Sequence, residues 1–272
     1  MLTIAEIWFD ISKTAIIGAS YAILLYSFFT AAFNWDISRP ENDRRIIGDT
    51  FSGLKKSARL FSRSYKELMS GNFATALDGF NEVKAMKLSP KEKAVLFFFL
   101  GKTYELMGYP TNSANFFKDS IDQGISFDEV YIKCGRMMVA CGNFSGAEDV
   151  YNELLSRETY LDTVYTDLGM AFLKADEPDR ALEAFSSALK RNLNYAFALG
   201  GMAVAYLLKK DAENANFFYA KAVLNNIEEL DGFTDYYIGI AESQGILESL
   251  TIKPKPKVYI DPQSLITQAM QN

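Results

Sequence analysis

Histidine is absent from this chain of 272 residues, and cysteine and tryptophan each occur only twice. Without histidine, the sequence lacks the commonest general base and the commonest metal ligand of proteins. Two cysteines are too few for a disulfide framework. No catalytic constellation and no cofactor motif stands out among the other residues. We therefore expect that this protein is not an enzyme and that it holds no cofactor and no metal.

The net charge of −6 is unevenly distributed along the chain. Residues 36–66 hold eight Lys and Arg against four Asp and Glu, whereas residues 67–272 carry a net charge of −9. An acidic body behind a short basic segment argues against nucleic acid as a partner.

Residues 14–35, TAIIGASYAILLYSFFTAAFNW, contain no charged side chain. As a helix these residues would extend about 33 Å, which is enough to cross a hydrocarbon core of about 30 Å. Trp8 and Trp35 would then lie near the two headgroup layers, the level that tryptophan prefers. The sequence therefore predicts one transmembrane helix, and a cleaved signal peptide is the alternative.

Basic residues follow the predicted span rather than precede it, since only Lys13 lies before it. The positive-inside rule then places residues 1–13 outside the cytoplasm and everything after the span within it. Cleavage of a signal peptide would instead place the rest of the chain on the extracytoplasmic side. Residues 36–56 are predicted to form a basic juxtamembrane linker. The side chains expected at the membrane interface are Trp8, Trp35, Arg44, Arg45, Lys55 and Lys56.

Apolar residues from Ile47 to Leu68 recur at alternating steps of four and three, which is one stripe of an α-helix. In one interpretation this stripe is a basic amphipathic helix that lies on an anionic membrane surface. In the other, residues from about 54 onward form the first helix of the folded domain. Gly48 and Gly53 favour the second interpretation, because each costs a helix about 1 kcal/mol relative to Ala.

A period of 34 residues organises the rest of the chain. The segments LGKTYELMGYP, CGRMMVACGNF and LGMAFLKADEP place Gly101, Gly135 and Gly169 at this spacing. A large aromatic residue follows sixteen positions after each glycine, and Tyr219 follows Ala203 in the same way. These aromatic residues are Phe117, Tyr151, Phe185 and Tyr219. The two cysteines, at 134 and 141, belong to this repeated pattern, so we interpret them as small hydrophobic residues rather than a metal or redox site.

The pattern resembles the tetratricopeptide repeat (TPR) family, in which each repeat consists of two antiparallel helices. Four copies between about residues 94 and 227 are in register, and a degenerate copy at 71–83 precedes them. One repeat cannot bury its apolar face alone, so the repeats must stack into a solenoid. The predicted fold is all-α. It comprises the transmembrane helix, a TPR α-solenoid of about five repeats over residues 57–250 that ends in a capping helix, and a Lys/Pro-rich tail at 251–272 with a short helix.

In the TPR family, ligands usually lie in the concave groove lined by the first helix of each repeat. The resemblance implies that twelve residues of this chain line the groove. They are Val95, Phe98, Phe99, Lys102, Ile132, Lys133, Arg136, Val139, Met170, Leu173, Phe197 and Leu207. In the alternative, several of these side chains pack between adjacent helices and never meet solvent. Because no matching Lys and Asn residues precede Lys133 and Arg136, we expect no clamp for a C-terminal carboxylate.

A groove of this composition suits an apolar or helical peptide, for which a few buried anchors carry most of the affinity. The sequence therefore predicts a single-pass, membrane-anchored TPR scaffold that recruits or assembles a complex at the membrane. Its expected partners are the lipid bilayer and a protein or peptide ligand. The alternative is a self-assembling structural protein, whose repeats or C-terminal tail join copies into a homo-oligomer.

Overall fold

The structure is a computed structural model that describes residues 40–51, 55–125, 127–158 and 161–252. This part of the chain contains twelve α-helices, one short 3-10 helix and no strand. The predicted span at 14–35, the two tryptophans and residues 253–272 of the tail lie outside it. None of the helices that the structure describes is both long and apolar enough to cross a membrane.

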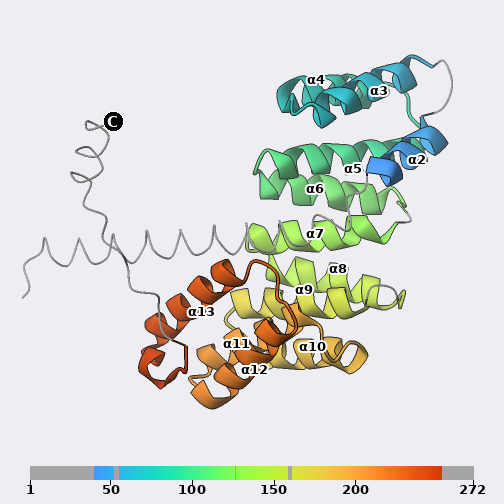
Figure 1. Ribbon diagram of the computed structural model, residues 1–272. Coiled ribbons are helices and arrows are strands. Elements are labelled where there is room, and N and C mark those ends of the chain that lie inside the picture. The colour runs from blue at the N-terminus through green and yellow to red at the C-terminus, as the bar shows by residue number, and fades with distance from the viewer. Residues whose placement is uncertain (1–39, 52–54, 126, 159–160, 253–272) are drawn as a thin grey trace, which may run out of the picture.

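Ten of these helices form five pairs that stack in chain order, from α3 and α4 at the top of Figure 1 towards α11 and α12 at the bottom. The pairs are α3 (Lys56–Met69) with α4 (Phe73–Lys84), α5 (Pro90–Leu106) with α6 (Pro110–Asp122), α7 (Asp128–Ala140) with α8 (Phe144–Leu155), α9 (Leu161–Lys174) with α10 (Pro178–Arg191), and α11 (Ala196–Leu208) with α12 (Ala212–Leu224). The predicted solenoid of about five repeats is confirmed.

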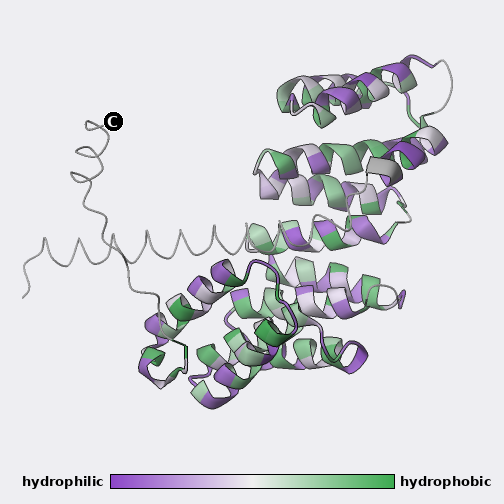
Figure 2. Cartoon of the chain, in the orientation of Figure 1, coloured by the Kyte–Doolittle hydropathy of each residue, from purple (hydrophilic) through white to green (hydrophobic). Residues whose placement is uncertain are grey.

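Helix α13 (Leu230–Gln244) and the 3-10 helix η1 (Leu247–Ser249) follow the last pair, and α13 packs on α11. The predicted capping helix is therefore present. Figure 2 shows that α11 is hydrophobic along most of its length, whereas α2 (Pro40–Thr50) is largely hydrophilic. A helix that is apolar on all sides needs partners on all sides. Helix α11 has them in α9, α10, α12 and α13.

The repeated glycines lie where the two helices of a pair approach most closely. A Cβ atom at Gly101 would lie 2.6 Å from the ring of Phe117, and one at Gly135 would lie 2.4 Å from the ring of Tyr151. Both rings are fully buried. The spacing of sixteen residues therefore separates a glycine of the first helix from an aromatic residue of the second helix. The ring of that residue occupies the space that a side chain at the glycine position would need.

Local signals set where the helices begin. Pro110 and Pro178 occupy first helical positions, where the missing N–H of proline costs nothing. Helix α5 begins with a capping box, in which the Glu92 N–H donates to Ser89 Oγ and the Ser89 N–H donates to Glu92 Oε2.

The segment predicted to be a juxtamembrane linker contains a helix of its own, α2. The apolar stripe between Ile47 and Leu68 is divided, because α2 ends at Thr50 and α3 begins at Lys56. Phe61 and Leu68 of α3 are buried, and α3 pairs with α4. The interpretation of this stripe as the first helix of the solenoid is confirmed, and one long surface helix is not what the chain forms.

Candidate binding face

The helices that begin each repeat share one side of the solenoid. We call this side the helix-A face, and define it by the surface that α5, α7, α9 and α11 form together. All twelve residues predicted to line the groove belong to these four helices. The twelve residues thus lie on four helices of the solenoid, and they differ in how far each side chain reaches solvent.

Most of these side chains are buried. Five of the twelve are at most 3% exposed, namely Val95, Phe98, Phe99, Ile132 and Leu207. Phe99 contacts the rings of Phe61 and Phe80, which belong to the core of the first repeat. Lys102, Lys133, Met170 and Leu173 are also buried, whereas Arg136, Val139 and Phe197 are half-buried. For the five most buried residues, the alternative in which they pack between helices is what the structure shows.

The three basic residues of the predicted groove each pair with a carboxylate on a neighbouring helix. Lys102 Nζ lies 2.8 Å from Asp43 Oδ2 of α2, and Lys133 Nζ lies 3.0 Å from Glu105 Oε2 of α5. Arg136 Nε donates to Asp167 Oδ2 of α9 at 2.8 Å. Each pair therefore connects α5 or α7 with the helix beside it on this face. The charges of these three cations are thus balanced within the chain.

Glu129 of α7 belongs to the same charged region. Its Oε1 atom is buried and accepts no hydrogen bond from the residues that the structure describes. Burial raises the pKa of Glu129 to about 7, although Lys102 and Lys133 lower it. The neighbouring carboxylates of Asp43 and Glu105 raise it further.

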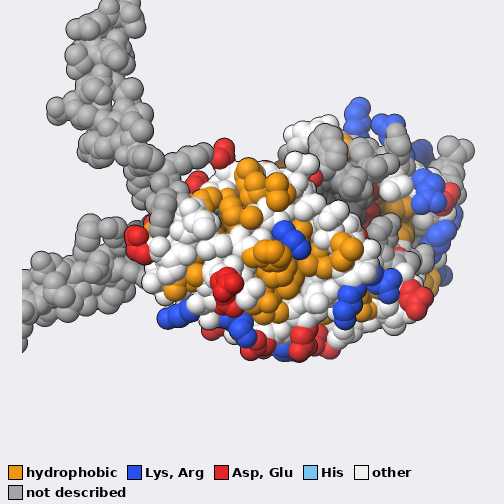
Figure 3. Space-filling view, turned by 60° about the horizontal axis from the view of Figure 1, so that its bottom comes forward, with side chains coloured by type: hydrophobic (Ala, Val, Ile, Leu, Met, Phe, Trp, Pro, Cys, Tyr) orange, Lys and Arg blue, Asp and Glu red, His pale blue; other side chains and the backbone are white. Residues whose placement is uncertain are grey.

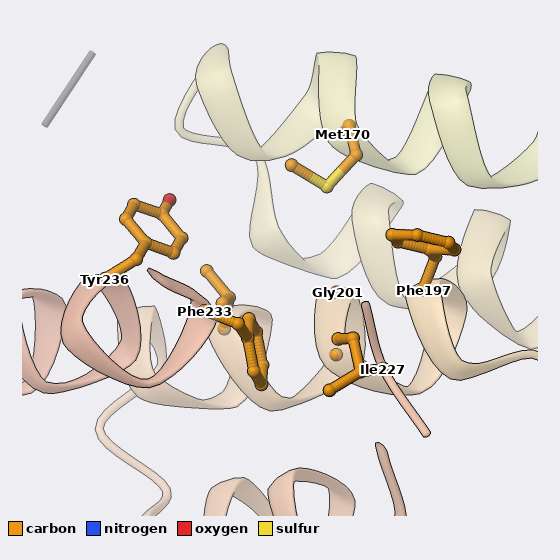
Figure 4. Close-up of a pocket in the computed structure, with 8 residues that line it drawn as sticks. Met170, Phe197, Gly201, Ile227, Phe233 and Tyr236 are labelled. Carbon is orange, nitrogen blue, oxygen red and sulfur yellow. The ribbon is translucent and has the colours of Figure 1, made fainter. Parts of the chain in front are cut away.

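An apolar recess opens on the helix-A face where α9, α11 and α13 meet. It is a small recess, with room for about one water molecule, and it is partly open to solvent. Figure 4 shows Met170 on one side of the recess and Ile227 and Phe233 on the other, with Phe197 and Tyr236 at its ends. The lining is completed by Gly200, Gly201 and Val204 of α11. No charged side chain lines it.

Gly200 keeps the recess open, and the adjacent Gly201 lets α11 approach the ring of Phe185 on α10. A Cβ atom at Gly200 would lie 2.7 Å from Ile227 Cδ1, and one at Gly201 would lie 2.3 Å from the ring of Phe185. Only Met170 and Phe197 of the twelve predicted groove residues line the recess. The wall that α13 provides was not predicted from the sequence, because a capping helix has no counterpart in the repeats. The Gly–Gly pair and the apolar spacing of Phe233 and Tyr236 are the signals that could have indicated it.

Similarity to solved structures identifies the architecture. A tetratricopeptide repeat protein from Parabacteroides merdae superposes with a TM-score of 0.59 at 15% identity, over 79% of this chain and 87% of that one. The fold is that of tetratricopeptide repeat proteins. The MamA protein gives a TM-score of 0.55 at 20% identity, over 64% of this chain and 94% of that chain. YrrB, described as a TPR protein with an unusual peptide-binding site, gives 0.53 at 15% identity, over 65% and 89%. No protein-family model and no curated protein sequence matches this chain.

The TPR solenoid thus presents two different surfaces on its helix-A face. The ion pairs lie on the second to fourth repeats, where α2 adds Asp43 to the surface. The recess lies on the fourth and fifth repeats and is completed by α13. The recess offers apolar side chains around a small open volume.

Charge is also divided along the TPR solenoid. Residues 40–93 hold eleven Lys and Arg against seven Asp and Glu, whereas residues 94–252 hold twelve against twenty-three. Arg44, Arg45, Lys55 and Lys56, which were predicted to lie at a membrane interface, are all exposed. Figure 3 shows basic side chains at the right of the molecule and a broad hydrophobic patch at the centre of the face in view.

Proposed function

We propose that this chain is a membrane-tethered TPR scaffold that binds a protein or peptide through the recess on its helix-A face. The recess carries the proposal, because it combines apolar walls, an open volume and half-buried aromatic side chains at its rim. Sites that recognise a side chain of a partner are mostly apolar hollows of this kind. The fold supports the same proposal, since the similar structure of YrrB is described as having a peptide-binding site.

The chemistry of the recess selects the ligand. Its lining carries almost no polar surface, so a charged or strongly polar side chain would lose its hydration there without compensation. An aliphatic or aromatic side chain would gain about 25 cal/mol for each Å² of apolar surface that it buries. The ligand that suits this lining is therefore a segment that presents an apolar side chain to the recess and its rim.

Replacement of Phe197 by Ala should weaken the binding of such a partner about tenfold, because loss of an aromatic side chain that contacts a ligand costs on the order of 1–2 kcal/mol. The partner can be captured by a photo-crosslinking amino acid at Tyr236, and the yield compared between wild type and variant. Phe217→Ala is the matched control, since Phe217 lies on α12 outside the recess and is 51% exposed. An equal loss of yield in both variants would contradict a binding role of the recess.

The tether is assigned to residues 14–35, which lie outside the part that the structure describes. Two features of the sequence support this assignment: these 22 residues contain no charged side chain, and basic side chains follow them. The exposed Arg44, Arg45, Lys55 and Lys56 would lie close to anionic headgroups, to which each basic side chain near the surface adds about 1 kcal/mol of attraction. On this proposal the solenoid is cytoplasmic and presents the recess to a partner there.

Cys141 is a natural reporter of the side on which the solenoid lies, because its thiol is exposed and Cys134 is buried. A membrane-impermeant maleimide should leave intact cells unlabelled and should modify one thiol per chain after permeabilisation. Cys141→Ser should abolish that labelling, and removal of residues 14–35 should release the chain from alkali-washed membranes. Labelling of Cys141 in intact cells would place the solenoid on the other side and contradict the cytoplasmic assignment.

A further inference from the structure

Helix α2 does not continue the stack of repeats. It packs on α5, although α3 and α4 separate the two helices in the sequence. Both carboxylate oxygens of Asp43 accept hydrogen bonds from Lys102 Nζ, at 2.9 and 2.8 Å. Six residues later along α2, the Asp49 carbonyl accepts a hydrogen bond from Lys91 Nζ. The order of these contacts shows that α2 runs antiparallel to α5 along the helix-A face.

Three side chains of this segment point inward at regular spacing. Asp43 is 4% exposed, Ile47 is 9% exposed and Phe51 is 5% exposed. The ring of Phe51 stacks on Phe61 with 4.1 Å between centroids. An acidic, an aliphatic and an aromatic residue at steps of four form one face of a helix. This is how a helical peptide occupies a groove, with anchors on one face and solvent on the other.

The intrinsic stability of α2 as a helix is low. An isolated helix of 11 residues is below the length at which helices persist in water, so α2 depends on its contacts. It also contains Gly48, which is exposed and lowers helix propensity. Its buried ion pair adds little net stability, because removing both charges from water offsets much of their attraction.

We infer that α2 is a displaceable internal ligand of the helix-A face. The partner that replaces it is an amphipathic helix with an acidic residue that reaches Lys102, an aliphatic residue four positions later and an aromatic residue eight positions later. This inference rests on the proposed binding function, to which it adds a second surface and its occupant. While α2 is bound, the apparent affinity of that partner is reduced by the fraction of chains in which the surface is open.

The test uses the full chain in detergent micelles and a fluorescent peptide with the sequence of residues 40–51 as the probe. Wild type should bind it weakly, because its own α2 competes at high effective concentration. Ile47→Ala in the chain should strengthen binding about tenfold, because it weakens only the internal competitor. Gly48→Ala should weaken binding about fivefold, because it stabilises the internal helix. Nothing lies within 4 Å of a Cβ at Gly48, so this variant introduces no clash.

Two controls assign the probe to its surface. Lys102→Met in the Ile47→Ala background should remove the gain in binding, and so should a peptide that carries Asn in place of Asp43. If Ile47→Ala and Gly48→Ala both leave the affinity for the probe unchanged, α2 is a fixed part of the fold and the inference is overturned. So would hydrogen exchange in α2 that is as slow as exchange in α5.

These outcomes are independent of the proposed function at the recess. The peptide assay needs no natural partner and reads only the surface around Lys102. Loss of the crosslink from Tyr236, in contrast, reports on the recess between α9, α11 and α13. Each assay can therefore fail without the other.

Discussion

Asp167→Ala is expected to lower the free energy of unfolding by about 3–5 kcal/mol, because it removes the carboxylate to which the guanidinium of Arg136 donates in the interior. The Asp167 side chain is 6% exposed and that of Arg136 is 17% exposed. Burial raises the pKa of Asp167, and Arg136 offsets part of that rise. The carboxylate and the guanidinium therefore depend on each other. Urea unfolding of the full chain in detergent, followed by circular dichroism, measures the loss.

Two further variants test whether the loss of stability comes from the burial of this ion pair rather than from the removal of a charge as such. The double variant Arg136→Met with Asp167→Leu should be near wild type, because neither charge then has to be buried. Asp122→Ala breaks the pair of Lys118 and Asp122, whose side chains are 46% and 55% exposed, and should cost less than about 1 kcal/mol. If Asp167→Ala is no worse than Asp122→Ala, the ion pair between α7 and α9 does not hold these repeats together.

Gly135→Ala should destabilise the solenoid by about 2–3 kcal/mol, although it adds one methyl group. The new Cβ would lie 2.4 Å from Tyr151 Cζ, and Tyr151 is fully buried between its neighbours. The ring cannot withdraw without opening the contact between α7 and α8. The shift of the urea midpoint and of the thermal unfolding temperature measures the effect.

The same substitution at Gly48 is the matched control. Gly48 lies in a helix, it is exposed, and nothing lies within 4 Å of its added Cβ. Gly48→Ala should therefore stabilise its helix by up to about 1 kcal/mol, the opposite sign to Gly135→Ala. Tyr151→Leu combined with Gly135→Ala should recover part of the loss, since a smaller side chain leaves room for the methyl group. Equal effects at Gly48 and Gly135 would contradict a steric origin.

The predictions that succeeded concern contacts within one repeat. Gly135 and Tyr151 meet because the two helices of a pair are joined by a short turn, so their spacing along the chain nearly fixes their spacing in space. A repeated glycine and a repeated aromatic residue therefore predict helix pairs, their register and their stacking. The start of α6 at Pro110 and of α10 at Pro178 follows from equally local chemistry.

The predictions about the groove were less complete, because exposure depends on what covers a helix. The family pattern assigns Phe98 and Phe99 to the groove, but the rings of the first repeat and the loop before α7 bury both. The side chain of Asp43 was part of a predicted linker, yet it lies against Lys102, 59 residues further along the chain. A signal was present in the sequence, since Asp43 continues the apolar stripe of Ile47 and Phe51 at steps of four. Periodicity alone does not say which surface such a stripe meets.

The sequence by itself determined the all-α repeat architecture, its period and the buried ring behind each repeated glycine, because these follow from short-range spacing. It also predicts a membrane span at residues 14–35, which stays a prediction. Only the tertiary structure decided that α2 covers the helix-A face of α5 and that α13 closes a recess with α9 and α11. The physical reason is that both features join segments that do not follow one another in the repeat pattern. Their positions depend on shape and charge complementarity between surfaces that exist only after the repeats have stacked.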